Sequence, residues 1–186
     1  MRTFIALDLP TEFADDVAAL GRLLSAAMEG RFLARDTYHL TLAFLGDIDD
    51  PETTRAMDAL DEAVDKLRDP EASLLLSPDG LGKFGRPQDA TLWLGIAKTP
   101  ALEALAINLR NALQARDLSF DDKAFLPHIT LGRRVRIPKD KLPALAFPLP
   151  AEAPSVTLYK STLSREGATY KPLYQRTLTP DPTRRV

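Results

Sequence analysis

The sequence predicts an α+β fold of two related lobes, in which antiparallel sheets with flanking helices face each other across a central cleft. Two short strand-like stretches, 38–45 and 127–135, contain the same four-residue pattern at an offset of 89 residues. The same offset places residues 4–7 on residues 93–96, so the two halves of the chain look like structural repeats. Two strand-like runs near the C-terminus flank a short turn, which favours antiparallel pairing.

Each half is predicted to run from an apolar strand through an amphipathic helix to a strand that carries a histidine. Helix starts support this order, since Thr99 and Asp50 each place a capping side chain before a proline. The predicted helices span 11–28, 51–68 and 100–115, and the predicted strands span 4–7, 38–45, 72–76, 90–96, 127–135, 155–163 and 169–178. The predicted irregular segments are a Gly/Pro-rich loop at 78–87, a proline-rich connection at 138–154 and a frayed end at 180–186.

The composition is that of an ordinary globular chain. Its 186 residues, 45% hydrophobic and 27% charged, suffice for one domain, residues 1–186, built of two fused lobes without a linker. The absence of cysteine excludes a disulfide framework and a thiolate metal site, and it agrees with a cytoplasmic location. No run approaches the roughly 18 apolar residues of a membrane span, so no membrane association is expected. A monomer is the default expectation.

The charge of the chain limits its partners. A net charge of −2 argues against broad electrostatic wrapping of a polyanion. Two local basic clusters could each hold one or two phosphates: Lys83 with Arg86, and Arg133 with Arg134 and Arg136. The sequence therefore favours a site for a phosphate group over a surface for a nucleic acid duplex.

The chain has only two histidines, and each begins the same pattern, HLTL from His39 and HITL from His128. Residues two apart share a face of a strand. His39 is therefore expected to point the same way as Thr41, and His128 the same way as Thr130. The residues expected on the core face are Leu40, Leu42, Phe44, Ile129 and Leu131. The small residues expected next on the polar face, Ala43 and Gly132, would leave room for a ligand.

Two histidine and threonine pairs suit chemistry at phosphorus. Because imidazole titrates near neutrality, one ring can take a proton from an attacking oxygen while the other gives a proton to the leaving oxygen. Each threonine hydroxyl could donate to a phosphate oxygen whose charge grows in the transition state, and no metal or other cofactor is required. Two alternatives stay open: satisfied strand histidines, and a two-histidine metal site, which the lack of adjacent carboxylates disfavours.

Most of the chain resembles a known family. The runs that carry the resemblance are RTFIALDLP at the start, HLTLAFLG and PHITLGR around the histidines, and LYKS with GATY near the end. They resemble the two-histidine (2H) phosphoesterases, and among them the bacterial and archaeal RNA 2′,3′-cyclic phosphodiesterases, also known as 2′-5′ RNA ligases. The resemblance implies a bilobal fold with a pseudo-twofold axis and metal-independent hydrolysis of a 2′,3′-cyclic phosphate to a 2′-phosphate.

The resemblance also implies roles for individual residues. It makes His39 the acid that protonates the leaving 3′-oxygen and His128 the base that activates water, although the twofold symmetry lets the orientation of the substrate exchange these roles. Thr41 and Thr130 would bind the phosphate, and Arg133 would add charge-assisted contacts. The partner is then the 3′ end of an RNA, or a nucleotide, with a 2′,3′-cyclic phosphate.

Three further residues have open interpretations. Strict alternation from His128 puts Arg133 on the opposite face and Arg134 on the site face, unless a bulge reverses the order. Phe84 is a candidate for stacking on a base, or else anchors its loop to the core. Trp93 lies in an apolar strand and is therefore expected in the core.

Two other functions remain compatible with the sequence. The same site could act on another cyclic phosphodiester, or could join and cleave 2′-5′ linkages in RNA, because the motif recognises phosphorus and not the attached base. A noncatalytic module that binds RNA ends or nucleotides is the third possibility, and the intact histidines and threonines of both motifs argue against it.

Overall fold

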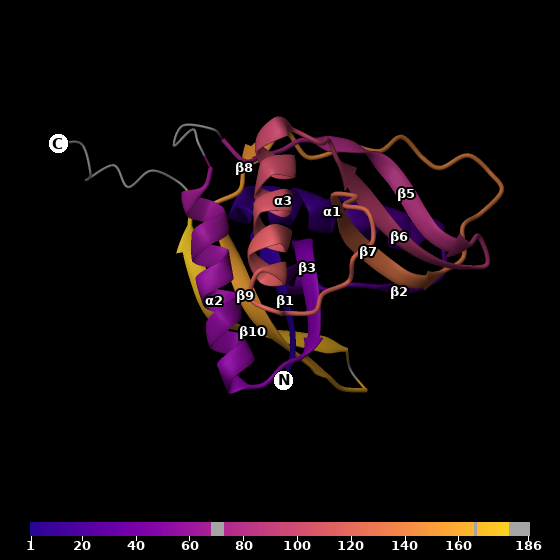
Figure 1. The fold of residues 1–186 in the computed structure, drawn as a ribbon. Coiled ribbons are helices and arrows are strands. Elements are labelled where there is room, and N and C mark those ends of the chain that lie inside the picture. The colour runs from indigo at the N-terminus through magenta and orange to yellow at the C-terminus, as the bar shows by residue number, and fades with distance from the viewer. Residues whose placement is uncertain (68–72, 166, 179–186) are drawn as a thin grey trace.

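The computed structural model describes residues 1–67, 73–165 and 167–178, and it confirms the α+β fold (Figure 1). The helices in this described part are α1 (Thr11–Ala27), α2 (Asp50–Asp65) and α3 (Pro100–Gln114), with a short 3₁₀ helix, η1, at Arg35–Thr37. The strands are β1 (Arg2–Leu7), β2 (Arg31–Phe32), β3 (Leu40–Asp47), β4 (Leu75–Leu76), β5 (Pro78–Arg86), β6 (Asp89–Ile96), β7 (His128–Val135), β8 (Ala151–Glu152), β9 (Ser155–Leu163) and β10 (Ala168–Thr177).

The main sheet has the strand order β10-β9-β1-β3-β7-β6-β5, with β2 paired to β7 and with antiparallel pairing throughout. Between β3 and β7 the register consists of one residue pair, Leu40 with Ile129. This pair joins a first half-sheet (β10, β9, β1 and β3) to a second half-sheet (β7, β6, β5 and β2). His39 and His128 directly precede the two paired residues, so the junction brings the two motifs together.

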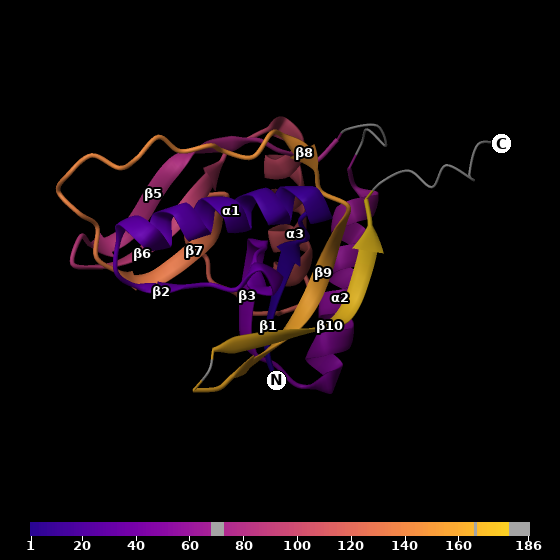
Figure 2. The ribbon, with the colours of Figure 1, turned by 180° about the vertical axis from the view of Figure 1, so that it is seen from behind.

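The helices lie on both sides of the molecule. In Figure 1, α2 and α3 lie next to each other in front of the first half-sheet, where α2 packs against β9 and β10 and α3 packs against β3. Seen from behind, α1 crosses the opposite side (Figure 2). The apolar faces of all three helices enter one core cluster, which also holds Leu40, Leu42, Ile129 and Leu131. The core therefore fixes the backbone of both motif strands.

Side-chain caps begin two of the helices. Asp49, and not the expected Asp50, caps α2: its carboxylate accepts from the Glu52 N–H at 2.8 Å, and the Glu52 carboxylate accepts from the Asp49 N–H at 2.9 Å. Thr99 caps α3 as predicted, since its hydroxyl accepts from the Leu102 N–H at 3.2 Å.

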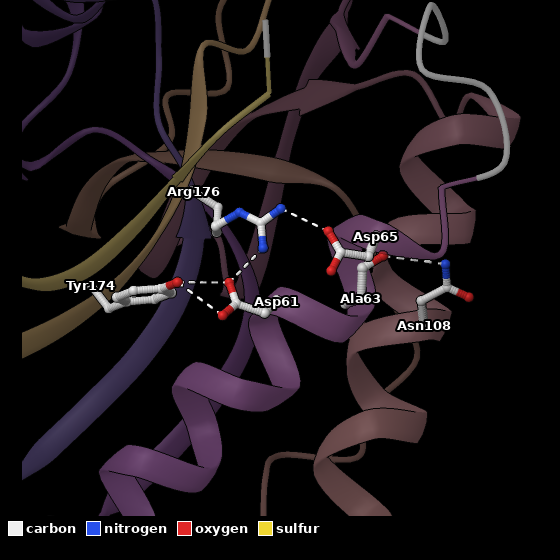
Figure 3. A network of polar contacts seen from close by, with 6 residues as sticks. All are labelled: Asp61, Ala63, Asp65, Asn108, Tyr174 and Arg176. Carbon is white, nitrogen blue, oxygen red and sulfur yellow. Dashed lines mark hydrogen bonds and ion pairs between the residues drawn. The ribbon is translucent and has the colours of Figure 1, made fainter. Parts of the chain in front are cut away.

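A polar network fastens the end of the first half-sheet to α2 (Figure 3). The Asp61 carboxylate accepts hydrogen bonds from the Tyr174 hydroxyl at 2.7 Å and from the Arg176 guanidinium at 2.6 Å. Arg176 also donates to Asp65 at 2.8 Å. These contacts hold β10 against the helix, and the guanidinium directly compensates the charge of Asp61.

The predicted loop at 78–87 is wrong, because residues Pro78–Arg86 form β5 and pair with β6 in a hairpin. The glycines that suggested a loop meet the needs of this hairpin. Gly85 has a φ of 83°, which suits the approach to the turn. Gly82 lies so close to Trp93 that a Cβ atom would come within 2.0 Å of the indole ring. Glycine content alone therefore did not separate a loop from a glycine-rich strand.

Other boundaries differ from the prediction by smaller amounts. Of the strand expected at 72–76, the described part is β4 at Leu75–Leu76, and the connection at 138–154 contains the short strand β8. The helix expected at 51–68 ends earlier, at Asp65, with Lys66 as its C-cap. Residues 68 and 72 and the expected frayed end at 180–186 lie outside the described residues. Each helix in the described part of the chain is too short or too polar to span a bilayer.

Candidate active site

His39 lies one residue before β3, and His128 begins β7. The two rings are held in the same way. Nδ1 of His39 donates to the Thr37 carbonyl at 2.7 Å, and Nδ1 of His128 donates to the Leu126 carbonyl at 2.6 Å. Because a carbonyl can only accept, the proton of each neutral ring sits on Nδ1 and leaves a lone pair on Nε2. Both rings can therefore accept a proton at Nε2, or donate one from it once protonated.

The two motifs lie across from each other at the junction of the half-sheets. Leu40 pairs with Ile129 in antiparallel register. His39 and His128 each directly precede one member of this pair, and Thr41 and Thr130 each directly follow one. The two histidine and threonine pairs therefore meet at the junction.

A β-bulge follows the threonine of the first motif. Ala6 lies opposite Thr41, but the residue before it in β1, Ile5, lies opposite Ala43. Leu42 is therefore an extra residue in β3. Leu42 stays buried in the core, and the alternation of faces is inverted beyond it.

The second motif has the same bulge at the same place. Trp93 lies opposite Thr130, and Leu92 lies opposite Gly132, so Leu131 is the extra residue in β7. Leu131 is also fully buried. The two strands therefore repeat both the chemical pattern and its irregularity, which supports a common local architecture.

The bulges overturn two expectations and decide a question that the sequence left open. Ala43 and Gly132 were expected to open a pocket on the site face, but the register turns both to the core side, where they are buried. Phe44 was expected in the core, yet it is half-buried outside the core cluster, and the Arg2 guanidinium lies 4.9 Å from its ring centroid. Arg133, expected on the far face by strict alternation, comes to the site face.

Arg133 is the basic residue of its cluster that acts on the site. Burial is the main cause of the pKa shifts of His39, His128 and Tyr170, and the Arg133 charge acts on all three in the lowering direction. Arg134 instead occupies a second irregularity of β7, with a φ of 53°, and both arginines are exposed. The structure thus separates two arginines that the sequence left ambiguous.

The two histidines have depressed pKa values for the same main reason. Burial lowers the pKa of His39 from its ordinary value of 6.5 to about 4, although the Thr37 carbonyl and the Asp8 charge act in the raising direction. Burial also lowers the pKa of His128, against the raising effect of the Leu126 carbonyl. In the ligand-free protein both rings are therefore neutral at pH 7.

Aromatic side chains from β1 and β10 surround His39. The Phe4 ring lies 4.7 Å from the imidazole, and the Tyr170 ring lies 5.2 Å away in an edge-on arrangement. Phe4 also stacks on Tyr159 at 5.3 Å. Sequence reasoning assigned no role to these rings, although the alternation of β1 places Phe4 on the face of Ala6 and Thr41.

Aromatic side chains from the β5–β6 hairpin surround His128. The Phe84 ring lies 5.2 Å from the imidazole, and the Trp93 ring lies 5.6 Å from it. The expectation that Trp93 belongs to the core is wrong: it pairs with Thr130 and is half-buried between the buried Leu92 and Leu94. Phe84 is 44% exposed, which leaves part of its ring free to contact a ligand.

The repeat offset needs a correction at the first strand of each half. The offset of 89 relates the two histidine motifs. However, Ala6 pairs with Thr41 and Trp93 pairs with Thr130, so β1 and β6 are related by an offset of 87. The expected equivalence of residues 4–7 with 93–96 is therefore shifted by two residues.

Residues that could hold a metal ion are a separate question. Within the ranges that the structure describes, no group of three or more histidine, aspartate or glutamate side chains is arranged to bind one. The groups on the site face that suit an anion are the threonine hydroxyls and the Arg133 guanidinium, and Asp8 is the one carboxylate whose charge acts on a histidine among the described residues.

This site and fold define a class of proteins. A family model of the 2′-5′ RNA ligase superfamily matches residues 9–164. The chain therefore belongs to this superfamily of two-histidine phosphoesterases, as the sequence resemblance implied.

Individual relatives are similar over nearly the whole chain. An RNA 2′,3′-cyclic phosphodiesterase of Thermotoga maritima is 32% identical over 182 residues, which cover 94% of each chain. An RNA 2′,3′-cyclic phosphodiesterase of Escherichia coli K12 is 32% identical over 184 residues, or 96% of this chain and 97% of that one. The crystal structure of E. coli LigT complexed with 3′-AMP matches with a TM-score of 0.74 and 30% identity, covering 96% of this chain and 98% of that one.

Proposed function

We propose that this protein hydrolyses the 2′,3′-cyclic phosphate of an RNA end or a nucleotide to a 2′-phosphate, without a metal ion, by acid–base catalysis between His39 and His128. The observation that carries the proposal is the matched anchoring of the two rings. Both Nδ1 atoms are tied to backbone carbonyls, at 2.7 and 2.6 Å, at the one junction of the half-sheets. Two free Nε2 atoms are what a paired proton transfer needs.

The reaction needs one protonated and one neutral ring. A water molecule attacks phosphorus and gives its proton to the neutral Nε2, while the bond from phosphorus to the leaving ribose oxygen breaks. The protonated Nε2 of the other ring gives its proton to that oxygen. Both rings are neutral in the ligand-free protein, and the negative charge of the bound phosphate supplies the field that raises the pKa of one of them.

The phosphate is held by the groups that share the site face. Thr41 and Thr130 donate from opposite motifs to the nonbridging oxygens, whose charge increases in the transition state. Arg133 adds a charge-assisted contact from the strand that carries His128. Phe84 offers a partly exposed ring beside His128 on which a base can stack.

The relatives support the choice of substrate. The T. maritima and E. coli proteins are named RNA 2′,3′-cyclic phosphodiesterases, and the E. coli LigT structure holds the nucleotide 3′-AMP. A phosphodiester at a ribose fits the two aromatic clusters beside the histidines, because bases stack on such rings.

The test is incubation in EDTA with an RNA that ends in a 2′,3′-cyclic phosphate, with separation of 2′-phosphate and 3′-phosphate products. Wild-type protein is expected to form the 2′-phosphate, and a variant with both His39→Ala and His128→Ala is expected to be inactive. The Asp61→Asn variant, altered at a network outside the site, serves as the control for folding and purity. Activity that survives in the double variant, or that requires a divalent cation, would overturn the proposal.

A further inference from the structure

Asp8 is a carboxylate on the His39 side of the site to which the proposed reaction assigns no role. Leu7, the last residue of β1, pairs with Leu40, the first residue of β3. The residues that follow and precede this pair, Asp8 and His39, are therefore next to each other across the same two strands. The charge of Asp8 raises the pKa of His39, which agrees with this placement.

The carboxylate is held by four hydrogen bonds from neutral donors. They come from Ser155 Oγ at 2.5 Å, Thr157 Oγ1 at 2.6 Å, Tyr159 Oη at 2.5 Å and Gln175 Nε2 at 3.1 Å. Asp8 and burial together raise the pKa of the Tyr159 hydroxyl, so this donor keeps its proton at neutral pH. These bonds fix the position of the carboxylate and leave its full negative charge in place.

Asp61 shows what a structural carboxylate looks like in the same protein. It also accepts several hydrogen bonds, but one of its donors is the Arg176 guanidinium at 2.6 Å, which cancels its charge (Figure 3). None of the four donors to Asp8 is charged. The difference indicates that the site retains the charge of Asp8 and does not merely tie strands together with it.

Among the described residues, no carboxylate acts on His128 in the same way. His128 pairs with Gly95, and the offset of 87 between β1 and β6 makes Gly95 the counterpart of Asp8. The pseudo-twofold relation that matches the histidines, threonines and bulges therefore fails at this position. A charge present on one side only can distinguish two otherwise equivalent rings.

We propose that Asp8 is a positioning residue which makes His39, and not His128, the ring that carries the proton when a phosphate is bound, and so makes His39 the general acid. This inference rests on the function proposed above. The charged and titratable groups beside His39 are Asp8 after β1, Tyr170 on β10, and His128 and Arg133 on β7, while Tyr159 on β9 bonds to Asp8. Of these, Asp8 alone is a carboxylate.

The path of each proton follows from this assignment. A bound phosphate attracts a proton to either ring, and the substrate covers both rings, so the Asp8 charge decides between them. His39 then donates from Nε2 to the leaving ribose oxygen as its bond to phosphorus breaks. His128, still neutral, takes the proton of the attacking water as the new oxygen–phosphorus bond forms. The product is a phosphate monoester with the histidines left in exchanged protonation states.

The first test measures the histidine pKa values by NMR titration, with and without inorganic phosphate. The chain has only two histidines, so the His128→Ala variant suffices to assign both signals. In Asp8→Asn the pKa of His39 is expected to fall by about one unit or more, with a much smaller change at His128. Asp61→Asn, which alters a carboxylate away from the site, is expected to leave both values unchanged.

The second test measures kcat/KM for the cyclic phosphate between about pH 7 and pH 8. If His39 is the acid, a fall of one pKa unit makes its protonated form tenfold rarer, so Asp8→Asn is expected to be about tenfold slower. Asp61→Asn is expected to match wild type. Should the Asn variant fail to fold, Asp8→Ser, a smaller uncharged side chain that still offers an acceptor, carries the same expectations.

The outcomes separate this inference from the proposed function. An unchanged His39 pKa in Asp8→Asn overturns the inference, as does a lowered pKa without any loss of rate. An equal change in Asp61→Asn would show a general structural effect and also overturns it. Absence of turnover by wild type would refute the proposed function and, with it, the general-acid role, while the NMR titration would still decide whether Asp8 sets the protonation of His39.

Discussion

The two halves of the site share a local architecture but differ in their surroundings. Both histidines bond through Nδ1 to the carbonyl two residues earlier, and both motif strands bulge at the residue after the threonine. The His39 side adds Asp8 and the rings of Phe4 and Tyr170, whereas His128 faces Gly95 and the partly exposed Phe84, and both histidines are half-buried. The shared features are those that the proposed proton transfer at phosphorus needs twice. In that proposal, the unshared features decide which ring donates the proton.

The difference between the halves also has an electrostatic side. Arg133 lowers the pKa values of both histidines, so its charge does not distinguish them. Asp8 acts on His39, beside which it is held by neutral donors. The site therefore combines a cation that acts on both histidines with an anion that acts on His39.

The largest expected effect comes from removing either histidine alone. His39→Ala and His128→Ala should each lower kcat/KM for the cyclic phosphate by about 10²- to 10⁴-fold, because each removes one proton-transfer group. Circular dichroism and thermal unfolding check that both variants are folded. If one single variant kept nearly full activity, the two halves would not be functionally equivalent and paired catalysis would be excluded.

The threonine variants test whether the equivalence extends to phosphate binding. Thr41→Val and Thr130→Val keep the shape of the side chain and remove the hydroxyl, so each should lower kcat by about 10²-fold, the usual cost of one transition-state donor. Thr54→Val on α2, where the hydroxyl bonds only to the Asp50 carbonyl at 3.3 Å, is the matched control. Losses confined to one of the two motifs would show that the phosphate is held from one side.

The sequence was sufficient where structure follows from alternation and local caps. The three helices, most strands and the shared face of each histidine with its threonine depend on short-range patterns, and they were predicted correctly. The class of protein followed from the duplicated motif. Trp93 was within reach of the same reasoning, because alternation with Leu92 and Leu94 puts it on the site face, whereas the apolar character of its strand suggested the core.

The remaining errors come from one inserted residue per strand. The bulges at Leu42 and Leu131 leave both leucines in the core and invert the alternation up to the next irregularity of each strand. This inversion moves Ala43 and Gly132 to the core side and Arg133 to the site face. No local composition marks such a bulge, since it depends on how the neighbouring strand pairs. The role of Asp8 depends on donors near residues 155–159 and 175, a long-range arrangement that periodicity does not contain.

The two adjacent arginines of β7 offer a sharper comparison. Arg133→Gln should lower kcat/KM about tenfold, chiefly through KM, because it removes a charge-assisted contact to the phosphate worth roughly 1.4 kcal/mol at this exposed position. Arg134→Gln removes the same charge one residue later, away from the site face, and should leave kcat/KM unchanged. Steady-state kinetics at low and high salt measure both. An equal loss of kcat/KM in the two variants would mean that the arginines act through net charge. The bulge would then not determine which arginine contacts the phosphate.

The smallest expected effect is on stability, and it again separates the halves. The pKa of His39 is lowered from 6.5 to about 4 by burial, so between these pH values the unfolded chain binds a proton that the folded protein does not. The free energy of unfolding should therefore fall as the pH falls through this window. Thermal unfolding of wild type and His39→Asn at about pH 7 and about pH 4.5 measures it, because the variant lacks this titrating group and should lose less stability on acidification. The same loss in both proteins would show that the His39 ring is protonated as easily in the folded state as in the unfolded chain. That result would refute the lowered pKa of His39.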